Sequence, residues 1–283
     1  MNSALHPISV ETIDASRIAV LIPALNEELR IREVVQAALV QCQNVIVVDD
    51  GSTDSTCECI ADLPVTMIRH AKCKGKGESL RDGFKLAMER GFEGVLTMDG
   101  DGQHSARDIP RLLRAAARYP QRIVIGARLR KRAQQPTYRR LANEFGDWGI
   151  AWACGYPLAD SQSGQRYYPI AVAALADVAG EGFVFEADIL IQASRQLGTQ
   201  VVAVPIESRY QGPDLVQKFR RSHFRPLRDL YRITSHTIAR IFEYGHPARH
   251  YRLSRSGKPD IFDDAPVAET DAPATADNAN FSR

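Results

Sequence analysis

The sequence has no run of about eighteen consecutive apolar residues, so we expect no segment of it to span a bilayer. Its first residues lack the basic stretch followed by an apolar one that marks a secretory signal. Cysteine is scarce: the five residues are odd in number and scattered, unlike a disulfide framework. Together these absences predict a protein of the reducing cytoplasm.

Several ligand-binding motifs are also missing. No G-x-G-x-x-G follows the first apolar run, which argues against a dinucleotide-binding fold. The basic, glycine-rich segment 74–79 lacks the spacing of a P-loop, although Lys76 and the helix expected after it could still hold a phosphate. No RNA- or DNA-binding motif is present, so we expect no nucleic-acid partner.

The composition is that of an ordinary globular protein. With 283 residues, 44% hydrophobic and 25% charged, the chain is neither collagen-like nor wholly disordered. The net charge of +2 hides an asymmetry: residues 259–283 hold six acids and one base, a charge of −5, and the remainder carries +7. Seven Lys and Arg residues fall within 121–140 and seven within 207–232. Such runs are usually solvated surface, but they also suit phosphates of a substrate or an anionic membrane.

Short apolar runs alternate with helical periodicities, which predicts an α/β fold with a mostly parallel sheet. We expect strands at 17–22, 44–48, 65–68, 94–98, 122–126 and 200–206. We expect helices from 31 onward and at 53–60, 77–90, 107–118, 138–153, 186–197 and 226–243. The first strand should stop at Pro23, and Asn26 should cap the helix that follows.

Polar clusters follow three of these strands: Pro23-Ala-Leu-Asn-Glu27, Asp49-Asp-Gly-Ser52 and Asp99-Gly-Asp-Gly-Gln103. Because ligands of open α/β sheets bind beyond the carboxyl ends of the strands, these clusters should line one crevice. In the third, residues two apart face the same side of an extended chain. Two close carboxylates repel each other unless a cation lies between them, and oxygen ligands suit Mg²⁺ or Mn²⁺. The plainer interpretation is an acidic turn that caps a helix.

At this point the chain resembles family 2 glycosyltransferases of the GT-A fold, and most closely their dolichyl-phosphate mannosyltransferase branch. The resemblance is carried by Ile22–Glu28, Val47–Asp54, Gly75–Gly77, Met98–His104, Gly126–Arg128, Asp160–Arg166 and Val204–Ile206. It covers about residues 17–232. It implies a lead-in at 1–15, one GT-A catalytic domain at 16–225, a helical segment at 226–255 and a disordered acidic tail at 256–283.

The resemblance also implies a role for each matching residue. The nucleotide would contact Pro23, Asn26, Glu27, Asp49, Asp50, Lys76 and Asp99. A divalent cation, Mg²⁺ or Mn²⁺, would be held by Asp99, Asp101 and Gln103. The acceptor or its phosphate would contact Arg128, Arg166 and Arg209. The cation would act as a Lewis acid on the leaving diphosphate.

One departure from this branch bears on the acceptor. Relatives read Arg-x-x-Gly-x-Ser-Lys near the end of the catalytic domain, whereas this chain reads Ser208–Asp214 and then Ser222–Pro226. Phosphate contacts would then come from Arg209, Lys218, Arg220, Arg221 and Arg225. The Ser222–Pro226 segment resembles a subgroup linked to xanthomonadin or aryl-polyene pigment clusters. The C-terminal membrane-spanning helices common in relatives are absent from the sequence.

The acceptor decides which side chains are catalytic. A polyprenyl phosphate offers an oxygen that is already anionic, whereas a hydroxyl acceptor needs a general base in an inverting transfer. Glu186 and Asp188 lie where polymerising relatives carry their catalytic aspartate, although they could instead cap or solvate the following helix. The candidate catalytic set is Asp101, Glu186, Asp188 and Arg225.

The expected helix 226–243 is amphipathic. One face gathers Leu227, Leu230, Tyr231, Thr234, Ile238, Ile241 and Phe242. Such a stripe usually packs on a domain core, but it could also lie on a membrane surface and bring the site to a lipid.

We therefore expect a metal-dependent, inverting glycosyltransferase that moves a sugar from a UDP- or GDP-sugar to a lipid-linked acceptor, either a polyprenyl phosphate or a pigment or lipid hydroxyl. It should be cytoplasmic and peripheral at the inner face of the membrane. Two alternatives remain. A sugar-phosphate nucleotidyltransferase needs a basic, glycine-rich loop where this chain has Ala24–Glu27. A non-catalytic nucleotide-sugar-binding scaffold is disfavoured by the intact Asp99, Asp101 and Gln103.

Overall fold

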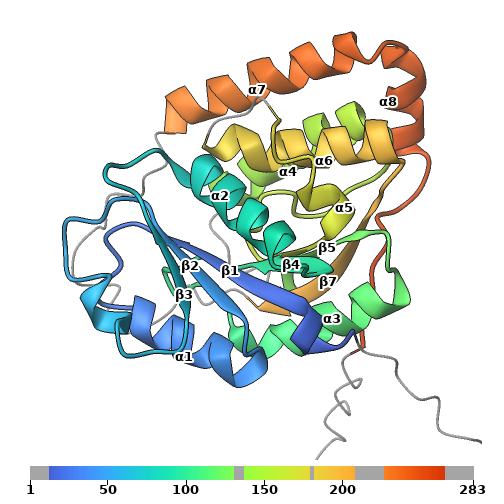
Figure 1. The fold of residues 1–283 in the computed structure, drawn as a ribbon. Coiled ribbons are helices and arrows are strands. Elements are labelled where there is room, and N and C mark those ends of the chain that lie inside the picture. Colours follow the sequence, from blue (N-terminus) through green and yellow to red (C-terminus); the bar gives the residue numbers. More distant parts are fainter. Residues whose placement is uncertain (1–12, 131–136, 179–181, 208–225, 265–283) are drawn as a thin grey trace, which may run out of the picture.

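Seven strands form one sheet in the order β3-β2-β1-β4-β6-β5-β7 in the computed structural model, which describes residues 13–130, 137–178, 182–207 and 226–264 (Figure 1). The strands are β1 Ile18–Ala24, β2 Val45–Asp49, β3 Thr66–Arg69, β4 Gly94–Thr97, β5 Ile123–Arg130, β6 Arg166–Pro169 and β7 Val201–Glu207. All run parallel except β6, which is antiparallel to both of its neighbours, β4 and β5. The predicted α/β class with a mostly parallel sheet is confirmed.

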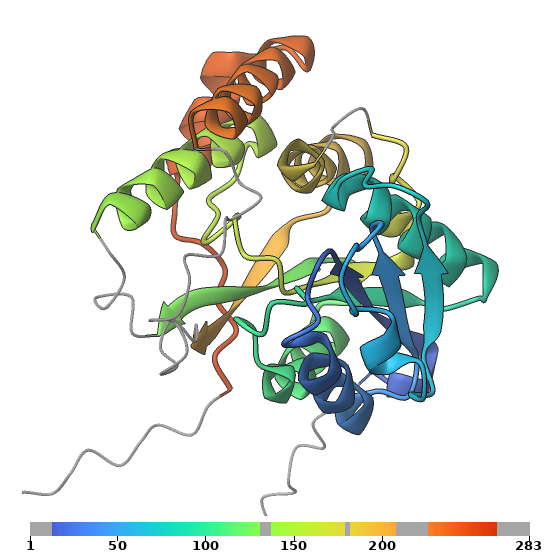
Figure 2. The same cartoon turned by 90° about the vertical axis from the view of Figure 1, so that its left-hand side faces the viewer.

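Helices cover both faces of the sheet (Figures 1 and 2). The α-helices are α1 Ile31–Gln41, α2 Lys76–Glu89, α3 Ile109–Arg118, α4 Thr137–Cys154, α5 Ile170–Ala173, α6 Phe183–Leu197, α7 Pro226–Glu243 and α8 Pro247–Arg255, and 3₁₀ turns are η1 Ala15–Arg17, η2 Glu58–Ile60 and η3 Ala106–Asp108. The alternation of side chains along β1 explains the two cores: Ile18, Val20 and Ile22 pack with α1 and α3, whereas Ala19 and Leu21 pack with α2 and α6. Helix α7 lies outside this layer, in contact with α4 and α6.

Strand β1 does not stop at Pro23, as the sequence suggested, but continues to Ala24 beside β2. Odd residues of β1 turn their backbone polar groups toward β4, as the bond from the Met98 N–H to the Leu21 carbonyl shows. The β4 ladder ends at Thr97, opposite Leu21. The N–H that proline lacks would therefore face the side where pairing has already ended, so Pro23 leaves no ladder bond unmade.

The prediction of a helix at 53–60 is also wrong, since only the 3₁₀ turn η2 forms there. Side chains of segment 52–56 instead bind the backbone of segment 26–28: Ser52 Oγ accepts from the Asn26 N–H at 2.9 Å, and Thr56 Oγ1 accepts from the Glu27 N–H at 2.8 Å. Asn26 does not cap α1, because its side-chain oxygen accepts from the Thr53 N–H. Short polar side chains that bond nearby backbone compete with helix formation in this way.

The acidic tail is not wholly disordered, since its first part is ordered as a strap along β7. Ile261 bridges Ala203, and Phe262 packs on the α1–α3 core and edge-on against Tyr119. The acids of this strap pair with arginines of α3, of β5 and of the residue just before β5. The pairs are Asp260–Arg122, Asp263–Arg111, Asp263–Arg130, Asp264–Arg111 and Asp264–Arg114. Ion pairing and one partly buried aromatic ring give this low-hydrophobicity segment a fixed position.

Two neighbouring residues of the strap should differ in their effect on stability. Phe262→Ala removes a ring that packs on the core, and we expect it to lower the free energy of unfolding by about 1–2 kcal/mol. Ile261→Ala removes a side chain that is 52% exposed, while its bridge to Ala203 is made by backbone, so we expect a change within about 0.5 kcal/mol. Equilibrium urea denaturation measures both. Equal losses would show that Phe262 does not anchor the strap.

Candidate functional site

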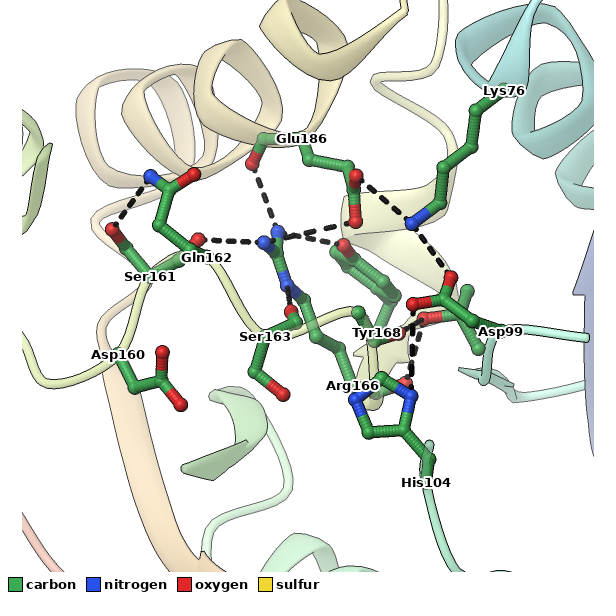
Figure 3. A network of polar contacts seen from close by, with 12 residues as sticks. Lys76, Asp99, His104, Asp160, Ser161, Gln162, Ser163, Arg166, Tyr168 and Glu186 are labelled. Carbon is green, nitrogen blue, oxygen red and sulfur yellow. Dashed lines mark hydrogen bonds and ion pairs between the residues drawn. The ribbon is translucent and has the colours of Figure 1, made fainter. Parts of the chain in front are cut away.

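The three polar clusters meet where β1, β2 and β4 end, as the parallel topology requires. Asp99 follows β4, and its side chain points at the ammonium of Lys76, the first residue of α2 (Figure 3). The Lys76 Nζ lies 2.7 Å from Asp99 Oδ1 and 3.1 Å from Glu186 Oε2, in the first turn of α6. One lysine thus joins the end of a strand to the starts of two helices.

The pKa values of the two acids in the Asp99-x-Asp101 motif are shifted in opposite directions. Burial alone would raise the pKa of Asp99, but the charges of Lys76 and His104 outweigh it and lower that pKa to about 2. Burial, and then repulsion from Asp99, raise the pKa of Asp101. Asp101 therefore carries a carboxylate that its surroundings do not neutralise. A divalent cation bound between the two acids would relieve this repulsion.

The other ligand expected from sequence, Gln103, is exposed and contacts Asp101 through its backbone N–H, which donates to Oδ1 at 2.9 Å. His104 is the residue that faces Asp99 instead. Its Nδ1 lies 3.6 Å from Asp99 Oδ2, buried and without a hydrogen-bond partner in the described residues. No three His, Cys, Asp or Glu side chains converge as a complete metal site within the described ranges. Two carboxylates and an orphaned imidazole fit Mg²⁺ or Mn²⁺, which take one or two carboxylates together with substrate phosphates.

Asp50 holds the loop in front of Lys76. Its two oxygens accept from the backbone N–H groups of Lys74 and Gly75 at 2.8 and 2.7 Å, and from the Cys73 thiol at 3.1 Å. His70 Nδ1 lies 2.7 Å away. These hydrogen bonds outweigh burial and lower the pKa of Asp50. They occupy the lone pairs of Asp50. This carboxylate therefore positions the loop before Lys76 and has no acceptor left for the base of a nucleotide.

Asp49 is similarly enclosed and only 1% exposed. Its oxygens accept from the Ser52 N–H at 3.1 Å and the Cys57 thiol at 3.1 Å, and Arg69 Nε lies 3.3 Å away.

Of the predicted nucleotide contacts, Pro23, Asn26 and Glu27 lie at the end of β1, half-buried beside segment 52–56. Their contact with a nucleotide stays a prediction.

Arg166 is a structural arginine in the floor of the site. It is 1% exposed, and four of its N–H groups donate to other residues of this chain. The acceptors are Ser161 O (2.7 Å), Ser163 O (2.7 Å), Glu186 O (2.9 Å) and Tyr168 Oη (3.1 Å). Those bonds hold the 161–166 turn against α6 (Figure 3). The guanidinium has little left for an acceptor phosphate, so the structure favours a positioning role over the predicted one.

Asp188 does not join the site. The sequence offered both Asp188 and Glu186 as candidate catalytic acids, but residues two apart on α6 point about 200° apart. Asp188 is fully buried on the opposite side, where both oxygens bind Arg240 of α7 at 2.8 and 3.0 Å and His236 lies at 2.8 Å. Asp188 fastens α7 to α6, and of the two acids only Glu186 lines the small pocket that Lys76, Asp99 and Arg166 also line.

A larger pocket of 410 Å³ lies on the other side of the 160–162 turn, between β5, α4 and the segment after α8. Arg128 lines it and forms a two-point contact with Asp160, at 2.6 and 2.8 Å. Arg140 and Arg255 also line it, and neither has an ion pair or hydrogen bond with another described residue. The predicted contacts Arg209 and Arg225 lie outside the described ranges.

Asp147 completes the wall of this pocket, and sequence reasoning missed it. Its carboxylate accepts from the backbone N–H groups of Asp160 and Ser161 at 2.9 and 2.7 Å. Burial raises the pKa of Asp147 to about 6, helped by the charge of Asp160 and opposed by the bonds from Ser161. Asp147 sits in a helix without any motif, so no sequence signal marked it. His104 stood within a recognised motif, but its burial against Asp99 depends on the fold.

The glycosyl transferase family 2 profile matches residues 19–168. An undecaprenyl-phosphate mannosyltransferase of Micrococcus luteus is 30% identical over 67% of this chain and 82% of its own. The UDP-N-acetylglucosamine–dolichyl-phosphate N-acetylglucosaminyltransferase of Methanococcus voltae is 31% identical over 53% of this chain and 68% of its own. Among solved structures, glucosyl-3-phosphoglycerate synthase of Mycobacterium tuberculosis in complex with UDP superposes with a TM-score of 0.56, at 21% identity, over 80% and 79% of the two chains.

Gly164 should be intolerant of a side chain because Asp99 fills the space beside it. A Cβ there would lie 2.4 Å from Asp99 Oδ2, so Gly164→Ala must displace the carboxylate, and we expect a loss of about 1–3 kcal/mol in the free energy of unfolding. Gly149→Ala is the matched control, since its Cβ meets only the Thr237 methyl at 3.6 Å and alanine favours the helix. Urea denaturation compares the two. Equal stability of both variants would contradict the placement of Asp99.

Asp147 should make stability depend on pH. Its pKa is about 6 in the folded chain against an ordinary value of 3.8 for an aspartic acid, so the folded state favours the protonated acid. That contribution is present below about pH 4 and is lost as pH rises through 6, by about 3 kcal/mol in total. The stability of Asp147→Asn relative to the native chain should therefore improve by about that amount between pH 4 and pH 7. A pH-independent difference in urea denaturation would show that Asp147 titrates normally.

Proposed function

The chain belongs to glycosyl transferase family 2, and from this we propose that it transfers a sugar from a nucleoside diphosphate to a polyprenyl phosphate at the inner face of a membrane. The names of two relatives, which act on undecaprenyl and dolichyl phosphates, support a lipid phosphate as acceptor. Membership of this family argues against the alternative of a sugar-phosphate nucleotidyltransferase. The resemblance to a pigment-cluster subgroup rests on Ser222–Pro226, of which the structure describes only Pro226, and it stays a prediction.

The observation that carries the proposal is the contact of Lys76 with Asp99 and Glu186. It gathers a cation, two anions and the start of α2 at the carboxyl edge of the sheet. Gly75, which precedes α2, has no side chain to cap the helix, so the first amides of α2 are suited to a phosphate. Lys76 and the start of α2 together would hold the diphosphate of the donor.

A divalent cation fits the donor site through Asp99 and Asp101. When bound, such an ion supplies Lewis-acid stabilisation of the charge that develops on the leaving diphosphate. Lys76 then has a defined task. Its ammonium serves as the counter-charge of Asp99 in the chain alone, and it lies near enough to contact a diphosphate oxygen beside that acid. The raised pKa of Asp101 is consistent with a carboxylate placed for a cation.

A phosphate acceptor needs no protein base, and Glu186 fits this. Its carboxylate lies 3.1 Å from Lys76 and 3.8 Å from Arg166, so two cations surround it. We infer that Glu186 orients Lys76 and does not remove a proton from the acceptor. The acceptor phosphate would approach from the larger pocket, where Arg140 and Arg255 supply charge and Trp148, Leu129 and Leu158 supply apolar walls.

Thermal unfolding with nucleoside diphosphates tests the donor site. UDP and GDP are each added with and without Mn²⁺, an ion that also appears with UDP-glucose in a complex of the Mycobacterium tuberculosis synthase. One diphosphate at about a hundred times its dissociation constant should stabilise the chain by about 2.7 kcal/mol, but only with the metal. Asp101→Asn should lose the shift, and Asp62→Asn, at an exposed acid paired with Arg32, should keep it. No shift with any diphosphate would favour a non-catalytic scaffold.

Transfer assays separate the two roles open to Glu186. With the matching nucleotide-sugar and undecaprenyl phosphate, Asp101→Asn should slow transfer by at least about a hundredfold, because it removes a metal ligand. Glu186→Gln should slow it by about tenfold or less and leave the acid limb of the pH–rate profile in place, since no base is lost. If Glu186→Gln is as inactive as Asp101→Asn and that limb disappears, Glu186 is a general base and the acceptor is a hydroxyl.

A further inference from the structure

Helix α4 carries an apolar stripe that its packing leaves uncovered. Leu141, Phe145, Trp148 and Trp152 recur at steps of four, three and four residues, so they fall within about 60° around the helix. Leu141 is 58%, Phe145 50% and Trp148 37% exposed. Elsewhere on α4, Ile150, Ala153 and Cys154 already fill the core. Exposed apolar residues that cluster along one line mark an interaction surface.

The rings of this stripe form a continuous cluster with α8. Phe145 stacks on Trp148 at 5.8 Å between ring centres, and Trp148 meets Trp152 at 5.5 Å. Tyr251 of α8, itself 40% exposed, lies 5.2 Å from Trp152. The Trp152 indole N–H donates to the Pro247 carbonyl at 2.9 Å, which fastens the inner part of the cluster to the start of α8. We call Leu141, Phe145, Trp148 and Tyr251 the aromatic face.

Basic side chains accompany the aromatic face. Helix α8 contains Arg249, Arg252 and Arg255 and no acid, and the first two are exposed on either side of Tyr251. None of the three has an ion pair with another residue of the described chain. Tryptophan, tyrosine and arginine together are typical of a surface that lies at the interface of an anionic bilayer.

Two further observations select a lipid surface from among the possible occupants. A second copy packed through the same face would bring the arginines of one α8 against those of the other, and like charges repel. Trp148 belongs both to the aromatic face and to the wall of the 410 Å³ pocket that also holds Arg140 and Arg255. A lipid whose phosphate enters that pocket would have its tail directed along the aromatic face.

We propose that the aromatic face of α4 and α8, with Arg249 and Arg252 beside it, is the surface on which this protein lies on an anionic bilayer. The proposal rests on the proposed lipid acceptor. Among the helices of the described ranges, none combines the length and apolar character needed to cross a bilayer. The amphipathic stripe of α7 is the competing surface. Its Ile233 and Ile241 are buried, and Tyr231, Ile238 and Phe242 are exposed.

The two tryptophans of the chain make the test direct, because Trp148 and Trp152 both lie in this cluster. The full chain is titrated with vesicles of phosphatidylcholine, alone or with about a third phosphatidylglycerol, and tryptophan emission is recorded. We expect a blue shift with the anionic vesicles, quenching by brominated phosphatidylcholine mixed into them, and weaker binding in 1 M salt. Vesicle binding without any change in tryptophan emission would overturn the proposal.

Three single substitutions locate the contact. Phe145→Glu places an acid in the aromatic face, outside the lining of the pocket, and should weaken vesicle binding by at least about tenfold. Phe242→Glu does the same on the exposed side of α7, and Val40→Glu, at a residue 79% exposed on α1 across the sheet, is the matched control. Both should bind as the native chain does. If only Phe242→Glu detaches the protein, α7 is the membrane surface and the proposal is wrong.

Activity distinguishes failure of this inference from failure of the proposed function. Relative to the native chain, Phe145→Glu should lose at least about tenfold more activity on undecaprenyl phosphate in vesicles than on a water-soluble prenyl phosphate of two isoprene units. Equal activity of the variant and the native chain in vesicles overturns the docking surface and leaves the function intact. Vesicle binding without transfer to either acceptor overturns the function. A dimer in sedimentation velocity that Phe145→Glu dissociates, with no vesicle binding, assigns the face to a second copy.

Discussion

The ion pair between Lys76 and Asp99 is the contact on which the site depends. It joins the end of β4 to the start of α2, and through Glu186 it reaches the start of α6. Buried ion pairs often stabilise a fold no better than apolar side chains of the same size. This cluster also carries an additional acid, Asp101, whose pKa burial and Asp99 raise. An acid left without a counter-charge beside one that is paired with lysine supports the proposed cation site more than it supports a purely stabilising role.

The surrounding loops hold this cluster through side chains that bond backbone. Asp50 fixes the amides of Lys74 and Gly75, Arg166 fixes the carbonyls of the 161–166 turn, and Ser52 and Thr56 fix the amides of segment 26–28. Each of these polar residues was a candidate ligand or helix former by sequence, and each is occupied by the chain itself. Precise placement of a few charged groups thus requires a larger number of polar residues that never touch a ligand.

The sequence alone predicted what periodicity and strand-end position determine. The parallel strands, the helices at 77–90 and 226–243, and the meeting of the strand-end clusters of Asp50 and Asp99 follow from the βα alternation, whereas the place of Lys76 beside them was implied by the family resemblance. It could not predict the short antiparallel β6, since Arg166–Pro169 has no apolar run, nor the strap, whose Phe262 acts through distant Tyr119. Asp188 was misjudged because residues two apart on one helix point in nearly opposite directions, and contacts with Arg240 and His236 hold it toward α7. Such errors arise wherever tertiary contacts decide the direction of a side chain.

Arginines with and without an ion pair lie on different parts of the molecule. The acids of the strap neutralise Arg111 and Arg114 on α3, Arg122 just before β5, and Arg130 on β5. Asp188 neutralises Arg240 on the inner side of α7. Arg140, Arg249, Arg252 and Arg255 stay without an ion pair to any described residue, and they lie on α4 and α8. These four arginines place positive charge beside the larger pocket and the aromatic face, so the proposed anionic lipid would be attracted to the side from which its phosphate can enter.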